Sequence, residues 1–365
     1  MGLPLAAPGR WNLRVRIESV EYGSPEVDEW AGRWFDGWFT VLDVGGTFGL
    51  TDPARRQATE ERVRTGRRVA SARRFALVLV LPADGADRVV AAASVELPLL
   101  DNTGVAFVDL AVLPDARRHG VGTALLTAVR DLAAAHGRTS LLAELVRPEA
   151  AAPETWPGCA FATARGFSFR LGSVRRNLAL PADGDRLAAL QVEADEHAAG
   201  YTVRTWSGPT PPEHRAELAG LEARMSTDAP LGDLDYEPEA WDADRIAEHD
   251  AEQVAIGRSW WTAVAVAPDG RWAAFTQLGW SPHEPERLYT WDTLVLREHR
   301  GRRLGLLVKL AVLAEATREV PQAKVVTTWN AAQNAPMIAV NEAMGFTSVD
   351  VDEEWQADLA DVVLP

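Results

Sequence analysis

Stretches of apolar residues, some alternating with polar ones and some continuous, divide the chain into predicted strands. Apolar and polar residues alternate over 11–20 and again over 201–207, which is typical of a strand with one buried face. Continuous apolar runs over 75–81 and 261–267 predict strands that are buried on both faces. Each continuous run ends in a turn that contains Pro, Asp and Gly. The same order of elements therefore occurs twice.

The repetition extends beyond these strands. Further strands are expected over 89–97 and 107–112 in the first half and over 272–278 and 290–296 in the second. Val112 and Val295 stand 183 positions apart, and Phe75 and Trp261 stand 186 apart. A nearly constant offset of this kind indicates an internal duplication.

A helical pattern follows the last of these strands in each unit. The apolar positions that share one helix face are Leu125, Leu126, Val129 and Leu132 in the first unit and Leu306, Leu310 and Leu313 in the second. Gly137 is placed to end the first helix, and Pro321 lies beyond the end of the second. Strands and helices of this kind predict an α/β fold.

The length and one polar stretch define the predicted domains. A chain of 365 residues is long enough for two domains of ordinary size. The polar stretch 181–200 has no counterpart inside either unit, so we place a linker there. The predicted domains are then 1–180 and 201–365.

Composition narrows the function classes. The net charge of −15 argues against nucleic acid as a partner, because nucleic-acid binding needs a basic surface. The same charge favours a cationic substrate such as an amine, or serves only to keep the protein soluble. The single cysteine, Cys159, excludes a disulfide within the chain. Neither a signal peptide, a membrane-spanning run nor a metal-ligand spacing is visible, so we expect a cytoplasmic monomer or homodimer without a metal.

The segment after the fourth strand of the first unit carries the most chemical information. Here a strand ends, a Gly-containing loop follows and a helix begins. Backbone N–H groups at a helix start have no partner within the helix, and together with the helix dipole they form a site for a pyrophosphate. The candidate cofactor-binding residues in and around this segment are Leu110, Ala111, Val112, Arg117, Arg118, His119, Gly120, Val121, Gly122 and Thr123.

This loop resembles the acetyl-CoA loop of the GNAT acetyltransferases, whose pattern is Arg/Gln-x-x-Gly-x-Gly/Ala. Arg117, Gly120 and Gly122 occupy its defined positions. The resemblance implies that acetyl-CoA is bound here as the acyl donor.

The second unit carries a similar loop with one departure. Arg303 stands where the family usually has Gly or Ala, so its side chain must point away from the ligand. Two interpretations remain open: Arg302 and Arg303 add charge near the phosphates, or the loop is a solvated basic segment of a relic domain. The candidate residues are Val295, Arg300, Gly301, Arg302, Arg303, Leu304 and Gly305.

The end of each unit also resembles this family. Both 162–167 and 341–346 resemble its terminal helix followed by Gly-Phe. The resemblance implies two GNAT-type domains in tandem, organised as in mycothiol synthase. Each would have a central mixed, mainly antiparallel α+β sheet with helices on both faces.

The resemblance also suggests catalytic positions. The family's oxyanion donor is a backbone N–H at the end of the fourth strand, which corresponds to 111–113 and 294–296. Its usual acid is a tyrosine, and Ala162 and Asn341 occupy that position here. Three carboxylates are candidates for the general base. Asp109 and Asp292 match each other across the repeat, and Glu144 is expected on the fifth strand.

The sequence thus predicts an N-acetyltransferase that moves the acetyl group of acetyl-CoA directly to a primary amine of a small molecule or peptide. Two alternatives stay open, namely a non-catalytic acetyl-CoA-binding sensor or assembly protein, and an acyltransferase that uses a longer acyl-CoA. The tryptophans concentrate in the second half, where most are expected in the core and some could line a substrate pocket.

Overall fold

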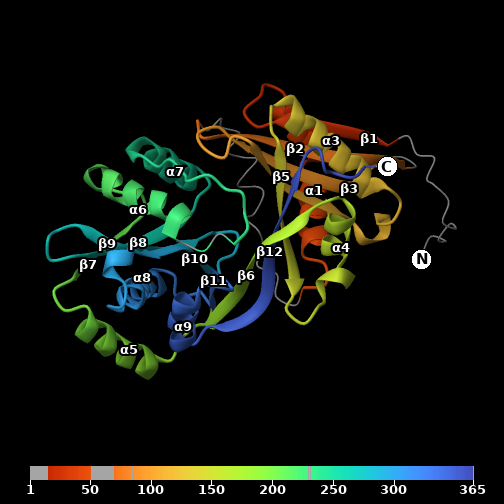
Figure 1. Cartoon of the computed structure of the whole chain (residues 1–365). Helices are drawn as coiled ribbons and strands as arrows, with labels where there is room; N and C mark the ends of the chain where they lie inside the picture. Colours follow the sequence, from red (N-terminus) through yellow and green to blue (C-terminus); the bar gives the residue numbers. More distant parts are fainter. Residues whose placement is uncertain (1–14, 51–69, 84–85, 229, 231, 365) are drawn as a thin grey trace.

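The computed structural model describes residues 15–50, 70–83, 86–228, 230 and 232–364. Within them, twelve strands form one continuous mixed sheet (Figure 1). The strands of the first half are β1 (Arg16–Glu21), β2 (Ala72–Ala83), β3 (Ala86–Pro98), β4 (Val105–Val112), β5 (Ser140–Pro148) and β6 (Ser168–Ala179). Those of the second half are β7 (Thr202–Ser207), β8 (Ser259–Val266), β9 (Trp272–Trp280), β10 (Arg287–Val295), β11 (Val325–Ala331) and β12 (Thr347–Asp358). The strand predicted over 11–20 lies partly outside the described residues.

Helices cover both faces of the sheet. Those of the first half are α1 (Val27–Gly46), α3 (Val121–Ala135) and α4 (Pro157–Ala164). Those of the second half are α6 (Arg215–Asp228), α7 (Ala243–Ala255), α8 (Leu304–Glu319) and α9 (Ala335–Met344), and α5 (Gly184–His197) lies between the halves in sequence. The predicted α/β fold with helices on both faces of a mixed sheet is confirmed. Among the described helices, none is long and apolar enough to cross a membrane.

The two halves exchange their last strands. The sheet order is β1-β2-β3-β4-β5-β12-β6-β11-β10-β9-β8-β7. The terminal strand of the second half, β12, pairs antiparallel with β5, and the terminal strand of the first half, β6, pairs antiparallel with β11. In Figure 1 the two strands cross the middle of the molecule side by side, in agreement with their mutual pairing. Each half of the sheet is therefore completed by the other half of the chain.

The predicted linker stretch contains a helix. Asp183 caps α5 by accepting a hydrogen bond from the Arg186 N–H at 3.1 Å. Ala194 and Ala198, four positions apart, are buried in the same core as α8. The stretch 181–200 is thus a connection that folds against the second half, and the domain division at this point remains a prediction because the sheet pairing crosses it.

The face of the first half that carries the site is packed by α1. Trp30, Trp34 and Trp38 follow one another at four-residue spacing, so they lie on one face of α1 and are buried against β2, β3 and Ala111. The Trp38 indole N–H donates to the Ala93 carbonyl at 2.8 Å, which satisfies its polar group inside the core. α3 and α4 pack on the opposite face. These contacts fix α1, β4 and α4 around one opening.

Candidate functional site

The strands β4 and β5 separate at the point where two predicted carboxylates stand. Their parallel pairing runs from Val105 opposite Ser140 to Val108 opposite Ala143. Asp109 and Glu144 are the next residues on each strand. Because strand side chains alternate, Asp109 lies on the same face of the sheet as Ala111, which packs against α1. Glu144 lies on the face opposite to that of Ala143, and so on the same face as Asp109. The structure therefore brings these two candidates together at the mouth of the gap.

Backbone donors of β4 point into this gap. The Leu113 N–H donates to the Val90 carbonyl of β3 at 3.0 Å. Since hydrogen-bonding directions alternate along a strand, the N–H groups of Leu110 and Val112 point the other way, toward β5. Of the amides predicted over 111–113, the Val112 amide is thus the one aimed at the gap, and Leu110 joins it.

The loop after β4 has the backbone geometry of an anion site. Arg118 and Gly120 adopt left-handed conformations, with φ of 65° and 83°. The first intrahelical bond of α3 runs from the Ala124 N–H to the Gly120 carbonyl, so the N–H groups of 121–123 precede it. A Cβ placed on Gly120 would meet no atom within 4 Å, which means that the cradle is open above this residue. The residues present therefore fit a pyrophosphate.

Arg117 holds the loop in place. Its guanidinium donates to the Val112 carbonyl at 3.1 Å and to the Gly45 carbonyl at the end of α1 at 3.3 Å. It also lies 4.8 Å from the centroid of the Phe48 ring, and burial lowers the pKa of the guanidinium. The side chain predicted to bind phosphate instead ties the loop to β4 and α1.

A cavity of about 850 Å³ joins these features. This volume lies within the range of small-molecule and cofactor sites. The predicted residues that line it are Asp109, Leu110, Ala111, Val112, Arg117, Arg118, Gly120, Gly122, Thr123 and Glu144. His119 and Val121 are not among the lining residues, and the Val121 side chain is buried in the core.

Part of the cavity wall comes from the second half of the chain. Arg175, Trp329, Asp350 and Asp352 line it from β6, β11 and β12. The Arg175 guanidinium donates to both carboxylate oxygens of Asp350, at 2.7 and 2.5 Å, and both side chains are buried. The Trp329 indole N–H donates to the Asp352 carboxylate. The strand exchange therefore delivers charged and aromatic side chains to the site of the first half.

Sequence reasoning missed this contribution. Asp350, Asp352 and Glu354 alternate along β12 and so share one face of the strand, and this period of two was visible in the sequence. What the sequence did not contain was the pairing partner of β12. The helix α1 was also missed, although Trp38 and Phe39 line the cavity from it.

The second loop repeats the backbone of the first. The Arg300 guanidinium donates to the Val295 carbonyl at 3.1 Å and to the Asp228 carbonyl, at the end of α6, at 3.2 Å. Left-handed conformations occur at Gly301 and Arg303, with φ of 80° and 55°. The glycine and the arginine have thus exchanged the two left-handed positions relative to the first loop.

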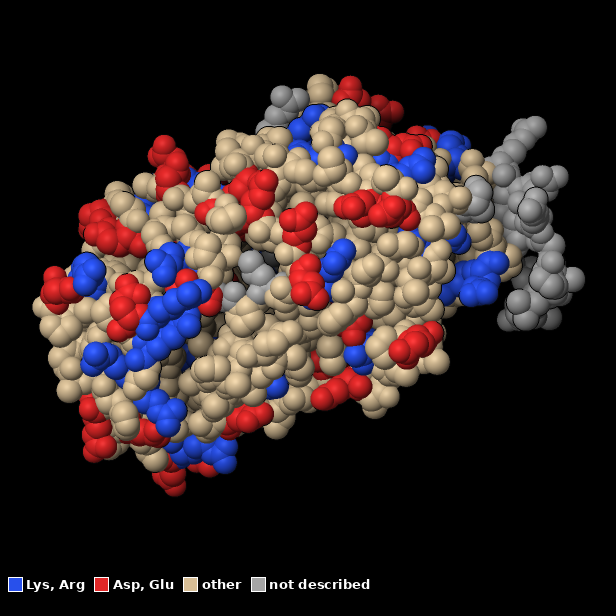
Figure 2. Space-filling view, viewed as in Figure 1, with Lys and Arg blue, Asp and Glu red and all other residues tan. Residues whose placement is uncertain are grey.

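The side chains of the second loop are engaged by the connection between the halves. The Arg303 guanidinium lies 2.5 Å from the Glu193 carboxylate of α5, and Arg302 stands 5.8 Å from the centroid of the Tyr201 ring. The prediction that the Arg303 side chain points away is met by this ion pair. On the face drawn in Figure 2, a group of basic side chains lies over the second half, and both basic and acidic side chains occur over both halves. Leu304 is buried in the core, and Gly305 packs against Val295.

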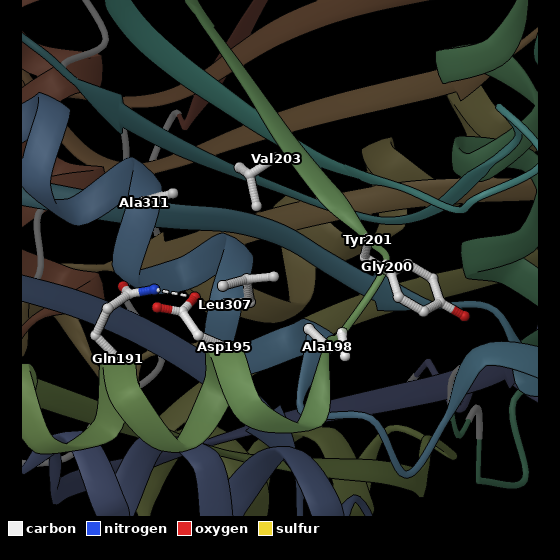
Figure 3. Close-up of a pocket in the computed structure, with 9 residues that line it drawn as sticks. Gln191, Asp195, Ala198, Gly200, Tyr201, Val203, Leu307 and Ala311 are labelled. Carbon is white, nitrogen blue, oxygen red and sulfur yellow. Dashed lines mark hydrogen bonds between the residues drawn. The ribbon is translucent and has the colours of Figure 1, made fainter.

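A second cavity, of about 470 Å³, lies between α5, β7 and α8. The Gln191 side chain donates to the Asp195 carboxylate on α5 at 2.9 Å. Figure 3 shows this pair with Leu307 and Ala311 of α8 across from it. The Tyr201 ring points away from these two side chains, and its hydroxyl lies 2.8 Å from His299 Nδ1. This cavity offers one carboxylate and none of the loop residues.

The other two catalytic candidates lie in the second half. Asp292 stands in a bulge of β10, and burial, followed by Glu239, raises the pKa of its carboxyl. Asn341 is fully buried and donates to the Asn330 side chain at 2.6 Å. The structure therefore places these two residues apart from the 850 Å³ cavity, and their catalytic role remains a prediction.

Comparison with known proteins agrees with this architecture. The family model of the acetyltransferase (GNAT) family matches residues 50–167 and 231–346, so the chain belongs to the GNAT acetyltransferase family. No curated protein matches the chain.

Solved structures add the tandem arrangement. A tandem GNAT protein from the clavulanic acid biosynthesis pathway, solved without AcCoA, is 29% identical with a TM-score of 0.70, and the match covers 94% of this chain and 99% of that one. A GCN5-related N-acetyltransferase from Sphaerobacter thermophilus shares the fold at 17% identity and a TM-score of 0.58, with 93% and 96% of the two chains covered. The predicted tandem organisation is confirmed.

Proposed function

We propose that the protein transfers an acetyl group from acetyl-CoA to a primary amine in the cavity of the first half. The observation that carries this proposal is the convergence of three features on one cavity. They are the loop cradle before α3, the inward N–H groups of Leu110 and Val112, and the carboxylates of Asp109 and Glu144. Membership of the acetyltransferase family supports the reaction class.

Each feature has a task in acyl transfer. The amides of the loop and of the first turn of α3 hold the pyrophosphate of the donor. The thioester end reaches the gap between β4 and β5, where the N–H of Leu110 or Val112 stabilises the oxyanion that forms on attack. A carboxylate at the mouth of the gap removes a proton from the acceptor ammonium, which leaves a neutral amine as the nucleophile.

The charge of the cavity wall supports a cationic acceptor. Five carboxylates line the cavity against four guanidinium groups: the carboxylates are those of Asp43, Asp109, Glu144, Asp350 and Asp352, and the guanidinium groups are those of Arg117, Arg118, Arg165 and Arg175. An excess of negative charge in a narrow site attracts an ammonium substrate and repels a carboxylate. The relative in a natural-product biosynthesis pathway favours a small molecule over a peptide as acceptor.

The second half supports the site of the first. It supplies the wall formed by β11 and β12, while its own loop is held by Glu193 and Tyr201. We therefore assign donor binding to the first half. We also propose that the protein works in the cytoplasm, without nucleic acid, as a monomer or homodimer.

Two measurements test this function. Calorimetric titration with acetyl-CoA is expected to give one equivalent per chain. Release of the CoA thiol is then followed with a panel of small amines, using acetyl-CoA and longer acyl-CoA donors in parallel. Binding without thiol release from any amine would favour a sensor or assembly role, and faster release from a longer donor would overturn the choice of acetyl-CoA.

A further inference from the structure

A carboxylate of the second half stands directly behind Glu144. In the antiparallel pairing of β12 with β5, Glu354 is the residue opposite Glu144. Directly opposed residues have Cβ atoms about 4.5–5.5 Å apart and point to the same face of the sheet. Glu144 lines the cavity, whereas Glu354 is half-buried one strand further in. On its other side Glu354 is paired with Leu171 of β6, which is apolar.

The surroundings of Glu354 disfavour its charge. Burial, followed by the negative charge of Glu144, raises the pKa of the Glu354 carboxyl to about 7. Tyr236 also lies within electrostatic reach of Glu354, and burial raises the pKa of its phenol well above the ordinary value, so it stays neutral. The nearby Glu353 belongs to the opposite face, where it binds Arg147.

We propose that Glu354 is a positioning residue for acetyl transfer, which receives through Glu144 the proton that the acceptor ammonium gives up. This inference rests on the proposed function of the first-half cavity. Glu144 is the group that touches the acceptor, and Glu354 makes the pair a stronger base than a single carboxylate. The strand exchange is what joins the two, because they belong to different halves of the chain.

The proton and electron balance closes without a further reactant. The ammonium of the acceptor loses one proton to the pair, and the resulting amine forms the C–N bond to the acetyl carbon. The C–S bond then breaks, and its electron pair leaves with the CoA sulfur. The second proton on nitrogen passes to this thiolate, which leaves as CoA thiol. The proton on the pair is released to solvent after the amide departs.

The pH dependence of turnover tests the proposal. With one acceptor amine throughout, the wild-type rate constant kcat is expected to fall on the acid side with an apparent pKa near 7. In Glu354→Gln this acid limb moves at least one pH unit lower, and kcat at pH 8 falls about tenfold, which is less than the roughly 10²–10⁴-fold that loss of a whole general base costs. The KM for acetyl-CoA stays within about twofold. Asp358→Asn removes a charge from the exposed end of the same strand and is expected to change neither limb nor rate.

The outcomes separate the inference from the function on which it rests. An acid limb that stays in place in Glu354→Gln, with only a smaller amplitude, would mean a structural role and would overturn the inference. No thiol release by wild type with any amine would instead overturn the proposed function. Carbon NMR of labelled glutamate keeps the inference testable in that case: the carboxyl resonance that is lost in Glu354→Gln must titrate near pH 7 in wild type. The absence of such a carboxyl in wild type would also overturn it.

Discussion

Gly122 offers the sharpest test of where acetyl-CoA binds. A Cβ on Gly122 would lie 3.3 Å from Val112 Cγ2 and 3.4 Å from Phe161 Cε2, two residues that line the cavity. A Trp at this position therefore has to project between the end of β4 and α4, across the path from the loop cradle to the gap. Gly305 has nearly the same environment in the second half, with Val295 Cγ2 at 3.4 Å and Met337 Cε at 3.6 Å. Gly305→Trp is thus a matched control.

The expected loss of affinity follows from the donors that the indole would obstruct. A hydrogen bond from a backbone N–H to a charged oxygen contributes about 1.5–3 kcal/mol. Obstruction of two such bonds costs about 3–6 kcal/mol, which corresponds to at least a hundredfold weaker binding. Gly122→Trp should gain a few tenths of a kcal/mol in helix propensity and lose about 1–3 kcal/mol by overpacking, so the fold should survive.

Calorimetry with acetyl-CoA, after a thermal scan has shown a cooperative transition in each variant, measures the outcome. We expect Gly122→Trp to lose binding and Gly305→Trp to keep the wild-type affinity and stoichiometry. Unchanged binding by a folded Gly122→Trp, together with loss in Gly305→Trp, would refute the assignment of the donor site to the first half.

Three further substitutions test individual contacts. The folded-state pKa of Glu354 lies above its ordinary value of 4.5, so the stability of wild type falls as the pH rises from about 4.5 to about 7. Urea unfolding should therefore show Glu354→Gln to be more stable than wild type by about 1–2 kcal/mol at pH 8 and equal to it at pH 4. Asp350→Asn leaves the buried Arg175 guanidinium without its carboxylate partner and should lower the free energy of unfolding in urea by about 3–5 kcal/mol. The double variant with Arg175→Met should recover most of this loss, and equal unfolding midpoints of the single and double variants would contradict that reasoning. Arg303→Gly removes a partly exposed ion pair with Glu193 but also relieves the strain of a left-handed backbone conformation, so the free energy of unfolding should change by less than about 1 kcal/mol. If calorimetry showed a second equivalent of acetyl-CoA bound to this variant, the arginine would have blocked the second loop.

Local signals were sufficient for the elements of the fold. The continuous apolar run of β2 and the strand, loop and helix order around Gly120 are encoded within short windows, and the structure has them where the pattern predicts. Glu144 was assigned to a strand, and it lies on β5. The duplication was visible because the same order of short strand and helix patterns occurs twice, separated by a nearly constant number of positions.

Long-range pairing was not encoded in this way. The alternating carboxylates of β12 predict a strand with one polar face, but the same pattern would serve equally well beside β6, β11 or β5. Only the assembled sheet shows that β12 stands between β5 and β6. The role of Arg117 was missed for a similar reason, since its partner Gly45 lies at the end of a helix 72 positions earlier.

The comparison of the two loops shows what has diverged between the halves. Both retain left-handed residues at the two corresponding positions, and in each loop one of these is an arginine, which pays about 1–2 kcal/mol of backbone strain there. The backbone cradle is therefore common to both, and the side chains around it differ. Arg118 lines the cavity of the first half, whereas Arg303 is bound to Glu193 of the connection between the halves. Because β12 leaves the second half to complete the first, it carries Asp350 and Asp352 to the cavity of the first half, and β6 joins β11 in exchange. One strand exchange thus accounts for the share of the second half in the acidic wall of the first-half cavity.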